Sequence, residues 1–158
     1  MQRLVDGYLE RSWRTEFPSW PSTPSSGLGY GGTARSIMEE ISMGRDWREV
    51  SRAAHGGQGS MGNGSAMRAP PVGAWFADEP DRLVEQARLS ALPTHAHPEG
   101  AAGAIAVAAA AAAAARGRKD LLAAALELTP QGKTRDGLER AHALGSDAPV
   151  DRAAQELG

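Results

Sequence analysis

The chain has 158 residues, of which 41% are hydrophobic, and this is enough for one domain with a buried core. Only 5% are aromatic and none is cysteine, so alanine supplies much of the apolar content, and disulfides and thiolate metal sites are excluded. Seventeen basic and 19 acidic residues give a net charge of −2, which argues against a nucleic acid or an acidic membrane as partner. Small side chains favour closely packed helices over a β-sandwich.

The first predicted element is a helix over residues 2–16, because its apolar side chains recur at helical spacing. These side chains are Leu4, Val5, Tyr8, Leu9 and Trp13. Prolines and small polar residues then predict a loop over residues 18–27. A domain linker is the alternative, but the residues before it are too few for an independent domain. The N-terminus has no signal-peptide apolar core, and together with the lack of cysteine this predicts a cytoplasmic protein.

Two further helices are predicted before the glycine-rich centre of the chain. Thr33 is a suitable N-cap for a helix through Met43, which Gly44 would end. Asp46 and Glu49 resemble a capping box that opens the next, short helix. The side chains expected to face inward are Ile37, Met38, Ile41, Trp47, Val50 and Ala54.

The middle of the chain predicts two helices and then a long central one. Residues 67–76 suit a buried helix only if Pro70 and Pro71 lie in its first turn or at a kink, and Trp75 is expected in the core. The next helix starts near Asp78 and stops at Pro93. Its predicted buried stripe consists of Leu83, Val84, Ala87 and Ala91.

A helix beginning at Pro98 contains an unbroken alanine run from Ala108 to Ala115. Its charge-free apolar stretch is shorter than the ~20 residues needed to span a bilayer, and alanine is only marginally lipophilic. We therefore expect the axis of a helical bundle and no membrane partner. Helical patterns follow at residues 121–128, 136–144 and 150–157. Every periodic segment has the helical period, so the predicted fold class is all-α.

One glycine-rich turn combines features that suit anion binding. It comprises Gly62, Asn63, Gly64, Ser65, Ala66, Met67 and Arg68. The glycines allow a positive φ and a close backbone approach, Asn63 tolerates the left-handed region, and Ser65 can accept a bond from a helix-start amide. Free amides at a helix start and the donors of Arg68 suit a phosphate group. The alternative is a plain connection in which Arg68 is a surface or packing residue.

A second motif follows at residues 94–99 and contains two histidines. The imidazole of His95 could contact a ribose or an attacked centre, although a loop or capping histidine is the competing interpretation. His97 is expected to cap the central helix, and Glu99 to complement a helix dipole. His55 and His142 are interpreted as solvated.

The two motifs, in this order and separation, resemble the ADP-ribosylglycohydrolase family, which includes dinitrogenase reductase-activating glycohydrolases. The resemblance spans roughly residues 4–128, with a looser match at residues 30–33, whereas residues 129–158 are only weakly assigned to the same single domain. It implies an all-α enzyme that uses two magnesium ions to cleave the bond between ADP-ribose and an acceptor. It also implies that residues 62–68 and His95 bind ADP-ribose or an ADP-ribosylated substrate.

The chain departs from the family at the metal site. Members hold magnesium with an Asp-Asp-Thr-type motif, an Asp-x-Asp-Thr-type motif and a further acidic residue, and neither motif occurs here. A dimagnesium site needs several converging carboxylates, but the aspartates of this chain are separated in sequence. We therefore assign no metal ligand and no catalytic residue, and we expect a form truncated at both ends that is nearly inactive by itself. The alternatives are a metal-free ADP-ribose or nucleotide-binding module and a non-catalytic helical interaction protein. The sequence does not indicate an oligomeric state.

Overall fold

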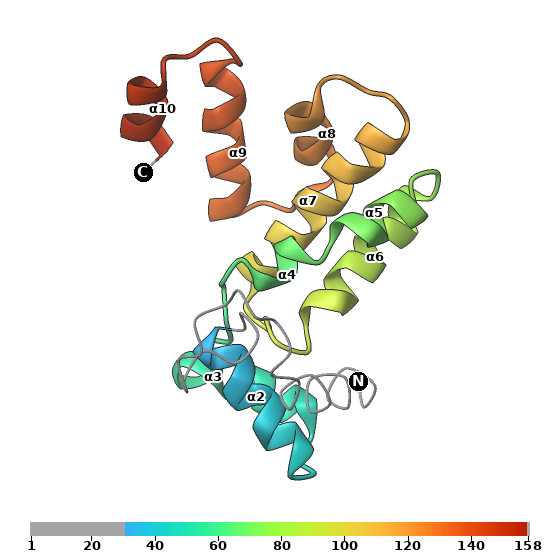
Figure 1. The fold of residues 1–158 in the computed structure, drawn as a ribbon, viewed down its shortest axis with the longest axis vertical. Helices are drawn as coiled ribbons and strands as arrows, with labels where there is room; N and C mark the ends of the chain where they lie inside the picture. The colour runs from blue at the N-terminus through green and yellow to red at the C-terminus, as the bar shows by residue number, and fades with distance from the viewer. Residues whose placement is uncertain (1–30, 158) are drawn as a thin grey trace, which may run out of the picture.

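The computed structural model describes residues 31–157, and within that range it contains nine helices and no β-strand (Figure 1). The all-α prediction is therefore confirmed. The predicted helix over residues 2–16 and the loop over residues 18–27 lie outside the described residues. The helices are α2 (Gly32–Ser42), α3 (Trp47–Gly57), α4 (Gly64–Met67), α5 (Pro70–Trp75), α6 (Pro80–Ala91), α7 (Pro98–Ala115), α8 (Leu121–Leu128), α9 (Lys133–Leu144) and α10 (Val150–Leu157).

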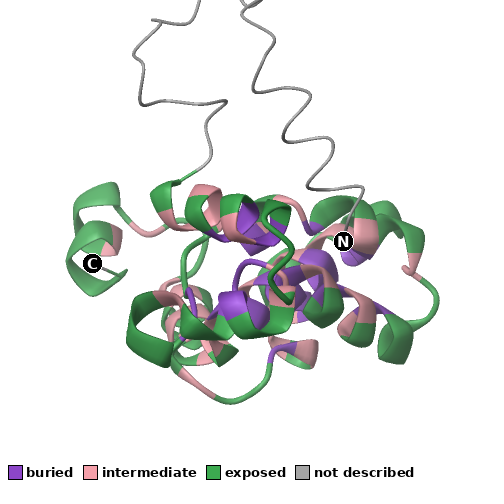
Figure 2. Cartoon of the chain, turned by 90° about the horizontal axis from the view of Figure 1, so that it is seen from below, coloured by how far each residue is buried: buried purple, intermediate pink, exposed green. Residues whose placement is uncertain are grey.

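The central helix α7 is the axis of the bundle, as its alanine content predicts. It packs against α4, α5, α6, α8 and α9, and most of its residues are buried. The buried residues gather in the interior of the described part of the chain (Figure 2). Small side chains permit a close approach at the crossing with α5, where a Cβ atom placed on Gly73 would lie 2.0 Å from the carbonyl oxygen of Ala108. The α6 stripe also meets this core, with Leu83, Ala87 and Ala91 almost fully buried. Small residues therefore bring the helix backbones close together here.

Among the described residues, α7 is also the one helix long and apolar enough to cross a membrane by length and composition. That observation is weak by itself, since the central helix of a folded domain passes the same test. Its packing against neighbouring helices on several sides is typical of such a core helix.

Helices α2 and α3 form a separate pair whose small core contains Ile37, Ile41 and Val50 (Figure 1, lower part). The predicted cap of α3 is confirmed, because the Asp46 carboxylate accepts a hydrogen bond from the Arg48 amide at 2.7 Å. The predicted cap of α2 is wrong. The N-cap position falls on Gly31, and the hydroxyl of Thr33 lies 3.2 Å from Nε2 of His55 instead.

The segment from 64 to 76 corrects two predictions. The chain forms the single turn α4 before α5, and Pro70 occupies the first turn of α5, where its missing amide hydrogen costs nothing. Trp75, expected in the core, is 81% exposed because it lies at the end of a six-residue helix, beyond the buried Gly73.

Helices α9 and α10 contain no buried residue. Both were predicted, but α9 begins at Lys133, three residues before the predicted start at Asp136. The carboxylate of Glu99 on α7 accepts hydrogen bonds from the amides of Lys133 and Thr134 at 2.9 and 2.8 Å. Glu99 lies in the first turn of the central helix, as expected, but its carboxylate is bonded to the start of α9 and caps that helix.

Candidate functional site

A cleft of about 860 Å³ lies where the start of α2, the glycine-rich turn and the 94–95 motif converge. It is lined by Gly62, Asn63, Gly64, Met67, Arg68 and His95 among the predicted site residues, whereas Ser65 and Ala66 do not line it. Thr33, His55 and Thr94 also contribute to its wall. Segments separated by about sixty positions in sequence therefore meet in one cavity.

The glycines of the turn are required for space and not for unusual backbone angles. Neither Gly62 nor Gly64 has a positive φ, and Asn63 lies in the right-handed region at φ −79°, so the left-handed expectation is wrong. A Cβ atom on Gly64 would lie 2.9 Å from Cε1 and 3.2 Å from Nε2 of His95. Residue 64 therefore has to be small if one edge of the His95 ring is to remain next to the turn.

Ser65 does not cap a helix, which corrects the sequence interpretation. Its side chain is fully buried, and the hydroxyl donates to the carbonyl oxygen of Gly100 at 2.7 Å. The bond ties α4 to the first turn of α7. Gly100 is itself confined, because a Cβ atom there would lie 2.7 Å from the Ser60 carbonyl oxygen and 3.0 Å from Cβ of His95. Ser65 thus holds the turn against the helix that follows His95.

Arg68 reaches across to the C-terminal end of α6. Its Nη2 donates to the carbonyl oxygen of Ser90 at 2.7 Å and to the hydroxyl of Thr94 at 2.8 Å. Longer bonds run from the same guanidinium to the carbonyl oxygens of Gly64 and Ala91. A cation at the end of a helix satisfies carbonyl groups that have no partner within the helix and complements the helix dipole. The packing role considered for Arg68 is therefore realised, and its charge also lies beside the cleft.

His95 is buried, with 6% of its surface exposed, and its Nδ1 lies 2.8 Å from the hydroxyl of Thr94. Burial, and secondly the positive charge of Arg68, lower the pKa of His95 from 6.5 to about 4. The ring is therefore neutral at neutral pH, because protonation would place a second cation beside a guanidinium away from water. His95 lies in the loop between α6 and α7, as predicted.

His97 caps the central helix as predicted, since its Nδ1 accepts a hydrogen bond from the amide of Glu99 at 3.0 Å. His142 is exposed, with its Nε2 3.4 Å from the Asp120 carboxylate. These two histidines do not line the cleft.

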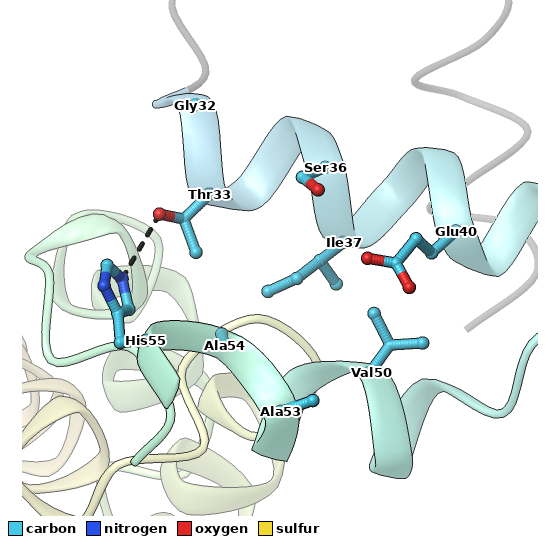
Figure 3. A pocket seen from close by; sticks show the side chains of 9 residues that line it. All are labelled: Gly32, Thr33, Ser36, Ile37, Glu40, Val50, Ala53, Ala54 and His55. Atoms are coloured by element: carbon cyan, nitrogen blue, oxygen red, sulfur yellow. Dashed lines mark hydrogen bonds between the residues drawn. The ribbon is translucent and has the colours of Figure 1, made fainter. Parts of the chain in front are cut away.

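A smaller pocket of about 350 Å³ lies between α2 and α3 and shares Gly32, Thr33 and His55 with the main cleft. Figure 3 shows the His55 ring directed towards Thr33 at one end of this pocket. His55 has φ +53°, an uncommon angle for a residue with a side chain. It is exposed, as predicted, but its place in the cleft wall was missed. The signals in the sequence were the glycines that follow it and the looser motif at residues 30–33.

No group of three or more histidine, aspartate or glutamate side chains that could hold a metal ion occurs among residues 31–157. Magnesium prefers several oxygen ligands in octahedral geometry. The described side chains therefore do not fit the dimagnesium site that the resemblance implies.

Comparison with known proteins identifies the family. The model of the ADP-ribosylglycohydrolase family matches residues 2–158. The chain belongs to this family. It is 36% identical over 120 residues to ADP-ribosylhydrolase ARH3 of Bos taurus, an alignment that covers 72% of this chain and 28% of the bovine protein. The human protein of the same name is 38% identical over 79 residues, covering 49% of this chain and 22% of the human one.

This family member spans less than a third of the length of the curated relatives it matches. The similarity to ADP-ribosylhydrolase ARH3 of Xenopus tropicalis, 36% over 80 residues, covers 49% of this chain and 22% of that protein. No solved structure matches the chain.

Proposed function

We propose that this chain carries the ADP-ribose-binding cleft of an ADP-ribosylglycohydrolase, which hydrolyses the glycosidic bond between ADP-ribose and an acceptor. Family membership and the relatives named ADP-ribosylhydrolase support this activity. The observation that carries the proposal is the convergence of the glycine turn and a neutral, buried His95 on one cleft of about 860 Å³. We place this activity in the cytoplasm, which the lack of cysteine favours.

The cleft has the chemistry expected for a charged nucleotide sugar. A neutral imidazole can donate to a phosphate or ribose oxygen through one nitrogen without bringing a second positive charge. The charge of Arg68, although the guanidinium bonds to carbonyl groups, makes the local potential more positive and favours a diphosphate. Gly62 and Gly64 leave the backbone accessible to a ligand. These features support binding of the ADP-ribose part of the substrate.

The assignment of magnesium as the cofactor is part of this proposal and rests on the resemblance to the family. Because the described side chains do not form a metal site, we derive no hydrolytic step from them. We expect the isolated chain to bind ADP-ribose without releasing it from a modified protein. Magnesium-dependent release at an enzyme-like rate by the purified chain would contradict that expectation.

Binding is tested by titrating ADP-ribose into the chain and following the amide signals by NMR. A charge-assisted hydrogen bond contributes about 1.5–3 kcal/mol, and ordering the ligand and the turn offsets part of this, so a dissociation constant nearer millimolar than micromolar is expected. Gly64→Ala places a methyl group against His95 and should weaken binding several-fold or more. The matched control is Gly137→Ala on α9, where a Cβ atom has only an ordinary contact of 3.8 Å with Arg140.

Circular dichroism should first confirm that both variants are folded. Equal affinities for the parent and the two variants, or signal changes confined to α9 and α10, would show that the cleft is not the binding site.

A further inference from the structure

The hydrogen bonds that link Arg68, Thr94 and His95 assign an indirect role to Arg68. We propose that Arg68 is a positioning residue that acts through the Thr94 hydroxyl to hold His95 as the Nε2–H tautomer, so that the ring donates a hydrogen bond into the cleft. The inference rests on the proposed function for its ligand, ADP-ribose. The tautomer itself is a property of the free protein and is testable without a ligand.

We call the hydrogen bonds from Arg68 through Thr94 to His95 the relay. The relay starts with Arg68 as the donor, because a guanidinium can only donate. Its Nη2 lies 2.8 Å from Oγ1 of Thr94, so the hydroxyl oxygen is the acceptor. The same nitrogen donates to the Ser90 carbonyl oxygen at 2.7 Å, and Nε donates to that oxygen at 3.3 Å. These bonds to the end of α6 hold the guanidinium next to the Thr94 hydroxyl.

Thr94 has one hydroxyl hydrogen, and its direction follows from this arrangement. Because the oxygen accepts from Arg68, the hydrogen is available for the other close neighbour, Nδ1 of His95, at 2.8 Å. Thr94 is 4% exposed, so water has little access to compete for this hydrogen. A hydroxyl that donates to Nδ1 requires that nitrogen to carry no hydrogen. The single hydrogen of the neutral ring is then on Nε2.

The Nε2 atom of His95 faces the glycine turn, so a hydrogen on this nitrogen points towards the cleft. A Cβ atom on Gly64 or Gly62 would lie 3.2 or 3.5 Å from Nε2, so this edge of the ring faces the two positions that have no side chain. All three residues line the cleft. The Nε2–H group is therefore a donor suited to a phosphate or hydroxyl oxygen. The depressed pKa of His95 agrees with a ring that stays neutral and donates.

The first experiment measures the tautomer in the free, full chain. Nitrogen-15 labelled histidine gives separate Nδ1 and Nε2 signals in a long-range proton–nitrogen NMR spectrum, and their shifts distinguish a nitrogen with hydrogen from one without. The chain has four histidines, and His95→Gln identifies the signals of His95. We expect hydrogen on Nε2 in the parent. Hydrogen on Nδ1 of His95 in the parent would overturn the proposal.

Two substitutions at one position then test the relay. Thr94→Val keeps the side-chain shape but removes the hydroxyl, so the fraction with hydrogen on Nδ1 should rise and ADP-ribose affinity should fall several-fold. Thr94→Ser keeps the hydroxyl and should restore both. Parent-like His95 signals in Thr94→Val would overturn the role of the hydroxyl, and a failure of Thr94→Ser to restore them would do the same.

Arg68→Lys tests the start of the relay. A lysine keeps the positive charge near the end of α6 but cannot bond the Ser90 carbonyl and Thr94 in the same fork, so a mixed tautomer is expected. An unchanged tautomer in the folded variant would remove Arg68 from the relay. If this variant does not fold, the tautomers measured in Thr94→Val and Thr94→Ser decide whether the relay exists. The expected tautomer without any ADP-ribose binding would refute the proposed function and leave the relay intact.

Discussion

The crossing of α5 over α7 and the C-terminal pair α9–α10 are both all-helical, yet they are held in different ways. At the crossing, Gly73 lets the α5 backbone reach the carbonyl group of Ala108, and ten residues of α7 are buried. Helices α9 and α10 bury none of their residues. Helix α9 is held by polar bonds instead: the Glu99 carboxylate accepts from the amides of Lys133 and Thr134, and Arg135 donates to the carbonyl oxygens of Leu126 and Thr129.

The difference shows that helical propensity alone does not tell which interactions hold a helix in the folded chain. Both regions have helix-forming sequences, but in the first the stability depends on the distance between backbones, and in the second on a few charged hydrogen bonds. Side-chain volume should therefore be critical at the crossing and nearly irrelevant in α9. The cleft shares the central helix α7 with the first region, because Ser65 of α4, next to the cleft, donates to the carbonyl oxygen of Gly100 on α7.

The largest effect is expected from Gly73→Ala at the crossing. The added methyl group would lie 2.0 Å from the Ala108 carbonyl oxygen, which belongs to the backbone of the central helix and cannot rotate away. Separating the two helices should lower the free energy of unfolding by about 3 kcal/mol or more, at or beyond the upper range for overpacked cores. Urea denaturation followed by circular dichroism measures the change. A loss below about 0.5 kcal/mol would show that the crossing is loosely packed.

The pH dependence of stability should separate the cleft from the start of α9, and His95 dominates it at the cleft. The pKa of His95 is lowered from 6.5 to about 4, so between these pH values the unfolded chain binds a proton that the folded chain does not. The stabilisation is fully present above pH 6.5 and is lost as the pH falls towards 4, by roughly 3 kcal/mol in total. Denaturation midpoints at a series of pH values measure this slope. His95→Gln should abolish it, and an unchanged slope would assign it to another group.

Glu99 should act in a lower pH window. Hydrogen bonds, first of all from the Thr134 hydroxyl, lower the pKa of the Glu99 carboxyl below its ordinary value of 4.5. Its contribution is therefore present above pH 4.5 and is lost as the pH falls through the lower, folded-state value. At pH 7, Glu99→Gln should weaken the cap of α9 by about 1 kcal/mol.

Amide hydrogen exchange of residues 133–136 provides the readout for Glu99→Gln, because faster exchange there without a change in α7 would locate the effect. The matched control is Glu85→Gln, which replaces an exposed glutamate of α6. Equal exchange rates in the two variants would mean that the Glu99 bonds do not hold α9.

The smallest change in the free energy of unfolding is expected from a control substitution in α9. Gly137→Ala in α9 places the new methyl group 3.8 Å from the nearest atom and leaves the helical backbone unstrained. Replacing glycine by alanine within a helix should raise the free energy of unfolding by about 0.5–1 kcal/mol. The same substitution thus has opposite signs at Gly73 and Gly137. Destabilisation by Gly137→Ala in urea denaturation would contradict the proposed open environment of α9.

Much of the helical framework was predictable because it depends on local signals. The central helix begins at Pro98 and ends at Ala115, where the proline and the end of the alanine run predict its limits. Asp46 caps α3 through its own side chain. Errors arose where a side chain has a distant partner. Thr33 and Ser65 were expected to cap helices, but their hydroxyl groups contact His55 and Gly100, which lie 22 and 35 positions away. A residue type that suits a cap equally suits a long-range bond, and sequence spacing does not distinguish them.

The sequence by itself determined the all-α class, the alanine axis and the two motifs that meet at the cleft, since periodicity, caps and breakers act within a few residues. Only the tertiary structure decided what those motifs do. It placed Arg68 on the end of α6 and made Thr94 the link to His95, and it gave Gly64 a steric role against that ring. The direction of each hydrogen bond depends on which groups from other helices compete for it, and that competition exists only in the folded chain.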